Sequence, residues 1–193
     1  MRHLRALAAA SLLVALAGCA ESSDAGSKGA GHNEADVSFA GDMIQHHAQA
    51  LQMVDLTMGR DLDPEVGALA DDIRAAQTPE IEKMADWLEE WDEPVPETVR
   101  DHANAHGDGM AMEHGSDVPG MMGAEEMESL EKASDAEFQD LWLEMMIEHH
   151  EGAVEMAQEE QEAGESAQAT DLAEDIETSQ TQEIETMEGL LGR

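Results

Sequence analysis

Two histidine pairs flanked by methionines are the residues of this chain whose types and spacing best fit a chemical role. In a helix, Met43 and His47 would lie one turn apart on one face, and Met146 and His150 repeat this spacing. A thioether sulfur is a soft ligand that suits Cu(I), whereas imidazole accepts several metals, so the combination predicts copper binding. The candidate metal ligands are Met43, His46, His47, Met53, Met146, His149, His150 and Met156.

The second histidine pair belongs to an internal repeat. The block MIQHHAQALQM begins at Met43 and the block MIEHHEGAVEM begins at Met146, a separation of 103 positions. A second pair of blocks keeps the same separation: LADDIRAAQTPEIEKM begins at Leu69 and LAEDIETSQTQEIETM begins at Leu172. Two pairs of blocks with one common separation indicate a duplicated unit that contains two segments.

Each segment has the apolar periodicity of an amphipathic helix. In the first, Phe39, Met43, His47, Ala50 and Val54 follow one another at steps of three or four residues. Helices are therefore expected at residues 36–59, 64–91, 135–163 and 167–191.

Local signals mark the ends of these helices. Asp63 followed by Pro64 is typical of a helix N-terminus. Ser134 with Glu137 three residues later fits a capping box, and Gly164 suits the end of the third helix.

Composition and connectivity predict an all-α fold. Hydrophobic residues make up 41% of the chain and aromatic residues only 3%, and strong helix formers predominate. The short connection within each unit predicts an antiparallel hairpin, and two hairpins that bury their apolar stripes together form a four-helix bundle. Pro79 should kink or split the second helix, because an interior proline costs about 3 kcal/mol. Residues 123–133 are expected to add a short helix.

Two amides and two carboxylates are predicted to support the histidines. Gln77 and Gln180 lie within the apolar stripes, where a buried amide needs partners. Glu80 and Glu183 follow one turn later, and a metal-bound histidine usually donates its other N–H to a carboxylate or carbonyl. We therefore expect these four residues to contact the histidine pairs.

The linker between the two units, residues 92–122, is rich in histidine and methionine. Short tracts of this composition bind metals without a fixed fold, although a merely biased loop composition is an equal alternative. The candidate auxiliary ligands are His102, His106, Met110, Met112, His114, Met121 and Met122.

The N-terminus predicts export and membrane attachment. Residues 1–18 contain arginines followed by an apolar run that is too short to span a bilayer, as in a secretory signal peptide. The run ends in a Leu-Ala-Gly-Cys sequence that resembles a bacterial lipobox, which implies cleavage before Cys19 and diacylglycerol attachment to its sulfur. Residues 19–34 then serve as a flexible tether to the membrane, and residues 35–193 form the bundle domain.

Charge and cysteine content exclude several classes of function. The net charge of −36 repels nucleic acid, and it also attracts cations non-specifically. Cys19 is the sole cysteine, so neither an internal disulfide nor a thiolate metal cluster is possible. The sequence shows no pairing of nucleophile and base and no phosphate-binding loop, so an enzyme is not expected.

The repeated blocks resemble the domain of unknown function 305 family. The matching motifs are M-I-x-H-H-x-x-A-x-x-M, with Phe39 and Trp142 four residues before the methionine, and L-A-x-x-I-x-x-x-Q-x-x-E-I-x-x-M. The resemblance implies a ferritin-like bundle. Some members are similar to exported copper-binding proteins of copper resistance that use His and Met ligands.

The resulting interpretation is an extracytoplasmic, lipid-anchored copper chaperone or sink that exchanges copper with a transfer protein. One alternative is a ferritin-like redox metalloenzyme with Glu80 and Glu183 as extra ligands. The di-iron pattern, however, has glutamate three residues before histidine, where this chain has Met43 and Met146. The other alternative is a metal-free interaction module in which the histidine pairs only shape the core.

Overall fold

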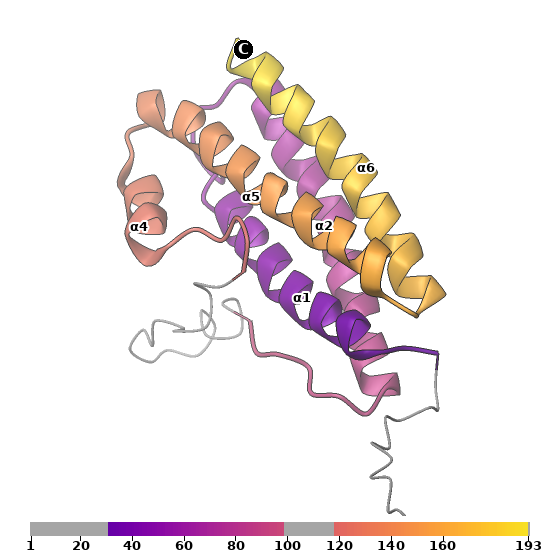
Figure 1. The fold of residues 1–193 in the computed structure, drawn as a ribbon. Coiled ribbons are helices and arrows are strands. Elements are labelled where there is room, and N and C mark those ends of the chain that lie inside the picture. Colours follow the sequence, from indigo (N-terminus) through magenta and orange to yellow (C-terminus); the bar gives the residue numbers. More distant parts are fainter. Residues whose placement is uncertain (1–30, 99–117, 193) are drawn as a thin grey trace, which may run out of the picture.

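The computed structural model describes residues 31–98 and 118–192. Within these ranges all regular secondary structure is helical, and the long helices pack side by side (Figure 1). The predicted all-α bundle is therefore confirmed. No helix in these ranges has the length and apolar character needed to cross a bilayer. The helices are α1 (Glu34–Asp55), α2 (Pro64–Glu90), α4 (Ala124–Lys132), α5 (Asp135–Ala163) and α6 (Ala167–Leu190).

The bundle consists of two helical hairpins, α1 with α2 and α5 with α6, which meet mainly through α1 and α5. Near the start of α5, the Trp142 indole N–H donates to the Met53 carbonyl near the end of α1 at 3.0 Å. At the opposite end, the Asp36 carboxylate of α1 accepts from the Ser166 N–H, just after α5, at 2.9 Å. Helices α1 and α5 are therefore antiparallel, and their middles, which carry the histidine pairs, lie against each other.

Side chains cap the N-termini of α1 and α2, and the cap predicted before α5 needs a correction. The Asn33 side chain accepts from two backbone N–H groups at the start of α1, and the Asp63 side chain accepts from the Glu65 N–H in α2. Ser134 does precede α5, but its hydroxyl donates to Glu137 Oε2 at 2.6 Å and caps no backbone N–H. The predicted capping box is therefore absent at this position.

Two helices differ in extent from their prediction. The first ends at Asp55 rather than residue 59, because the chain turns there toward Gly59, whose φ of 80° favours glycine. Pro79 does not split α2, which runs unbroken from Pro64 to Glu90. Both Pro79 and Ala75, whose carbonyl loses its N–H partner, are exposed, so water can satisfy that carbonyl.

The apolar core forms two clusters, one toward each end of the bundle. One cluster includes Met53, Trp142 and Met146, and the other includes Phe39 and Met156. Since α1 and α5 are antiparallel, the histidine pairs occupy the level between these clusters. The core therefore positions four imidazoles at the centre of the bundle.

A buried pair of carboxyl groups closes the end of the bundle where α5 leads into α6. Asp36 is fully buried and Glu160 is 2% exposed. Burial raises the pKa of Asp36, but hydrogen bonds from the Asn33 and Ser166 backbone outweigh it and leave the pKa lowered. Burial and the adjacent Asp36 raise the pKa of Glu160 to about 8. Gly164 leaves room for this group, since a Cβ there would collide with the Glu160 carboxyl.

Replacing Glu160 by glutamine is expected to stabilise the protein at pH 9 by roughly 1–3 kcal/mol and to change its stability little near pH 4. The raised pKa means that the folded protein binds more protons than the unfolded chain between about pH 4.5 and 8. Stability therefore falls as the pH rises through this window, and glutamine removes that loss because its amide does not ionise. The lowered pKa of Asp36 acts in the opposite sense but only below its ordinary value of 3.8, so it leaves this window unaffected.

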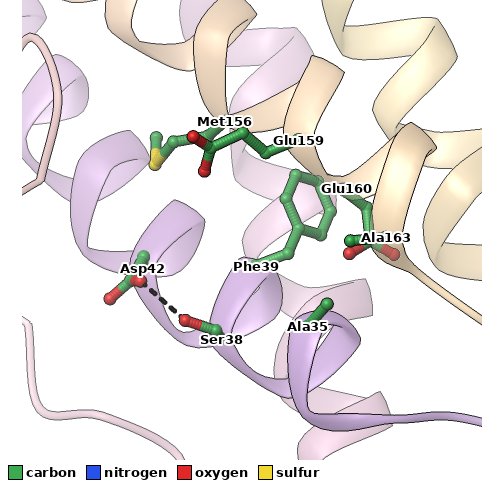
Figure 2. A pocket seen from close by; sticks show the side chains of 8 residues that line it. All are labelled: Ala35, Ser38, Phe39, Asp42, Met156, Glu159, Glu160 and Ala163. Atoms are coloured by element: carbon green, nitrogen blue, oxygen red, sulfur yellow. Dashed lines mark hydrogen bonds between the residues drawn. The ribbon is translucent and has the colours of Figure 1, made fainter.

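Urea unfolding at about pH 5, 7 and 9 measures this difference. Glu159→Gln is the matched control, because Glu159 is the exposed neighbour that lines the same surface pocket as Glu160, Phe39 and Asp42 (Figure 2). A Glu160→Gln variant with the same pH dependence as the wild type would contradict the assignment of a raised pKa to Glu160.

Candidate metal centre

Four histidines form a fully buried layer between α1 and α5. His46, His47, His149 and His150 each have 0% exposure. The rings of His46 and His149 pack against each other in a tilted arrangement, with centroids 3.7 Å apart and an angle of 37° between their planes. Because these two residues occupy equivalent repeat positions, the approximate twofold axis of the duplication passes between their rings.

The outer histidine of each pair contacts a glutamate of the partner helix in its own hairpin. His47 Nε2 lies 2.7 Å from Glu80 Oε2, and His150 Nε2 lies 2.7 Å from Glu183 Oε2. A neutral imidazole that donates Nε2–H to a carboxylate carries its free lone pair on Nδ1. In the neutral form of His47 and His150, the two contacts therefore leave Nδ1 as the electron-pair donor.

Most of the imidazole nitrogens in this layer have no hydrogen bond of acceptable geometry, although the backbone of Pro119 and of His149 lies near enough to His46 to oppose the lowering of its pKa. The unpaired atoms are six of eight: Nδ1 and Nε2 of His46 and His149, and Nδ1 of His47 and His150. Buried polar groups are normally paired, and leaving one unpaired costs about 1–3 kcal/mol. Such a concentration of unpaired nitrogens is better suited to binding a ligand than to stabilising the fold.

The protonation state of the central pair also suits metal binding. Burial lowers the pKa of His46 well below its ordinary value, and the neighbouring His47 and His150 add to this effect. Burial and then His46 lower the pKa of His149 in the same way. Both imidazoles are therefore neutral at neutral pH, so an incoming cation need not displace a proton from them.

The four flanking methionines are buried but not equally close to the histidines along the helices. Met43 and Met146 precede the first histidine of their pair by three residues, whereas Met53 and Met156 follow it by seven, about 10 Å along the axis. Met156 lines the surface pocket beside Phe39 (Figure 2). Met43 and Met146 are therefore the better placed thioethers, and a ligand role for all four stays a prediction.

The buried amides do not complete the layer. Gln77 and Gln180 are each 2% exposed, and neither side chain has a hydrogen-bond partner in the described structure. Of the four predicted supporting residues, Glu80 and Glu183 hydrogen-bond to a histidine, and the amides of Gln77 and Gln180 do not.

The layer is not a preformed coordination shell. Among residues 31–98 and 118–192, no three His, Cys, Asp or Glu side chains converge on a common point as metal ligands would. The central rings pack against each other at 37°, so ion binding requires them to rotate and aim their nitrogens at the ion. The unpaired nitrogens and nearby thioethers fit copper chemically, at the cost of this rearrangement.

The family relationship agrees with the duplicated motifs. The sequence profile of the domain of unknown function 305 (DUF305) family matches residues 36–191. The chain belongs to this family. The resemblance inferred from the paired blocks is thereby confirmed. Among curated protein sequences, none matches this DUF305 chain.

Several solved structures share the fold of this DUF305 protein. A DUF305 fragment from Deinococcus radiodurans is 30% identical, with a TM-score of 0.70 over 85% of this chain and 99% of that one. A DUF305 protein from Streptomyces coelicolor, named as a candidate secreted protein, is 33% identical, with a TM-score of 0.69 over 82% and 92%. CopM in its Cu(II)-bound form is 30% identical, with a TM-score of 0.65 over 80% and 94%; CopM has also been solved with Cu(I) and with Ag.

Part of the predicted auxiliary site lies outside the described residues of this DUF305 protein. These residues are His102, His106, Met110, Met112 and His114. Met121 is partly buried and Met122 is buried, immediately before α4. Cys19 and most of the tether also lie outside the described ranges.

Two residues beside the histidine layer were not identified from the sequence. Gln49 and Gly152 lie three residues after His46 and His149, at equivalent positions of the repeat. Both contact the segment just before α4, which has no counterpart in the duplication. The sequence did contain a signal, because the two repeat copies carry unlike residues here.

Proposed function

We propose that this DUF305 protein binds copper ions in the histidine layer and serves as an extracytoplasmic copper chaperone or sink. The observation that carries the proposal is the set of six buried imidazole nitrogens without hydrogen-bond partners. The repeated His–Glu contacts support it, because a carboxylate partner fixes ring orientation and raises the basicity of the ligating nitrogen.

The relatives support the same class of ligand. CopM, at 28–30% identity, has been solved in Cu(I)-, Cu(II)- and Ag-bound forms. Ag(I) is a soft monovalent ion like Cu(I), and both suit a site that combines imidazole with thioether. In this chain the thioethers of Met43 and Met146 would supply the soft ligands.

The location of the protein forms part of the proposal. Residues 1–18 would direct export, Cys19 would carry the lipid, and residues 19–34 would tether the bundle to the outer face of the membrane. The strongly negative chain would attract copper cations to this surface, the linker would capture ions at lower affinity, and a copper-transfer protein would exchange them.

Competition for Cu(I) against a chromogenic chelator tests the function on the soluble form, residues 20–193. The wild type is compared with a bundle variant in which His46, His47, His149 and His150 are alanine. The control is a linker variant with His102, His106 and His114 changed to alanine. We expect the tightest ion to be lost in the bundle variant, with its helicity retained, and kept in the linker variant. Equal Cu(I) binding by the bundle variant and the wild type would contradict the proposal.

A further inference from the structure

The segment just before α4, residues 119–122, lies across the α1–α5 interface at the histidine layer. We call it the cover segment. Its last residue is held by α1: Gln49 Nε2 donates to the Met122 carbonyl at 2.9 Å, and the Met122 N–H donates to Gln49 Oε1 at 2.7 Å. Both bonds are buried, so the amide of Gln49 binds the backbone of the cover segment as a neighbouring strand would.

On the other side, the cover segment touches the backbone of α5. Gly120 has a φ of 71°, and a Cβ on it would lie 2.9 Å from Gly152 Cα and 2.9 Å from the His149 carbonyl oxygen. A Cβ on Gly152 would collide with the Pro119 carbonyl. Two glycines are therefore needed for this approach of one backbone to the other.

These anchors lie beside the central imidazoles. Gln49 follows His46 by three residues, and Gly152 follows His149 by three, so each anchor lies about one turn beyond a central histidine. The backbone of Pro119 is close enough to His46 to act against the lowering of that residue's pKa by burial. The cover segment thus lies over the His46–His149 pair and contributes to its complete burial.

The duplication shows that this arrangement is a departure from symmetry. Gln49 and Gly152 occupy the same position in the two repeat copies, and one supplies hydrogen bonds where the other supplies space. The same residue in both copies could not seat the cover segment. A glutamine at position 152 would collide with the Pro119 backbone, and a glycine at position 49 would leave the Met122 N–H and carbonyl unpaired.

We propose that Gln49 and Gly152 are positioning residues that seat the cover segment over the His46–His149 pair, so that a bound ion leaves only when this segment is displaced. The inference rests on the proposed copper binding and adds a way in which the protein sets the rate of ion release. Displacement breaks the two buried hydrogen bonds to Gln49, which makes the cover segment a barrier to ion release. His46 and His149 remain the ligands, and the anchors act on the rate through the chain that they hold.

The test measures Cu(I) release from the loaded soluble form, residues 20–193, to excess chelator by stopped flow. Gln49→Leu removes both hydrogen bonds at similar volume, and we expect release to be roughly tenfold to a hundredfold faster. Gly152→Ala should displace the cover segment by collision and also accelerate release. Gly41→Ala is the matched control, because Gly41 lies within α1 with open space at its Cβ position, and its release rate should equal that of the wild type.

Hydrogen exchange of the Met122 amide gives a readout that needs no metal. Gln49→Leu should accelerate this exchange in the apo-protein, and helicity should be unchanged. If Met122 exchange accelerates while Cu(I) release keeps the wild-type rate, the cover segment is no barrier and the inference is overturned. Unchanged exchange of Met122 would overturn the seating role of Gln49.

If Gly152→Ala fails to fold, the result with Gln49→Leu decides the test alone. A wild type that holds no Cu(I) in its bundle would overturn the proposed function itself, and this inference with it.

Discussion

Replacing His46 and His149 together by leucine is expected to weaken Cu(I) binding by the bundle more than about 100-fold and to raise the stability of the apo-protein. Loss of an orienting partner alone costs 10- to 100-fold in metal affinity, so loss of two ligands should cost more. Stability should rise because four buried nitrogens without partners disappear, each of which costs about 1–3 kcal/mol. Packing differences between leucine and imidazole offset part of this gain, so we expect a net increase of about 1–3 kcal/mol.

Cu(I) competition and urea unfolding of the same double variant measure the two effects. The alternative, in which the histidines only shape a metal-free core, predicts the reverse: lower stability and unchanged metal affinity. Opposite signs for affinity and stability are typical of a functional site that is retained at a cost to the fold. A double variant that is both less stable than the wild type and equally able to bind Cu(I) would therefore support the metal-free alternative.

Replacing Glu80 and Glu183 together by glutamine is expected to lower Cu(I) affinity about 10- to 100-fold without removing a ligand. Each carboxylate lies 2.7 Å from Nε2 of an outer histidine and fixes the nitrogen that donates the proton. Glutamine retains the size of the side chain but loses the charge, and its amide can also present N–H to Nε2. The imidazole then loses its preferred tautomer, and Nδ1 becomes a poorer electron-pair donor.

The matched control changes Glu82 and Glu185 to glutamine. These residues occupy equivalent repeat positions two residues further along α2 and α6, and both are exposed. The control alters the net charge equally, so it separates orientation of the histidines from general electrostatic attraction. Equal affinity losses in the two double variants would show that Glu80 and Glu183 act only through the net charge.

The duplication is the reason that so much of the fold follows from the sequence. A common separation of the two block pairs predicts two equivalent hairpins, and their apolar stripes predict which faces pack. The contacts of Glu80 and Glu183 with the outer histidines also follow, because equivalent spacing in both copies places the carboxylates on facing helices. Capping was harder to predict, because the Ser134 hydroxyl can bond either to a backbone N–H or to the Glu137 carboxylate. In this structure it donates to Glu137.

Features that break the repeat could not be predicted in this way. The cover segment has no second copy, and its seat depends on a backbone-to-backbone approach at Gly152 that no periodicity encodes. The buried Asp36–Glu160 pair depends on the turn between α5 and α6, where residues distant in sequence meet. Gly164 illustrates the same limit: it fits because of the room left for Glu160, while its φ of −68° is open to any residue.

The most direct test of the central claim is to locate copper in crystals of the loaded soluble protein by anomalous scattering on either side of the copper absorption edge. Copper binding in the histidine layer predicts an anomalous peak inside the bundle, within bonding distance of an imidazole nitrogen of His46 or His149, with the central rings rotated apart. Peaks confined to surface carboxylates or to the linker, with the two rings still packed together, would contradict this binding site.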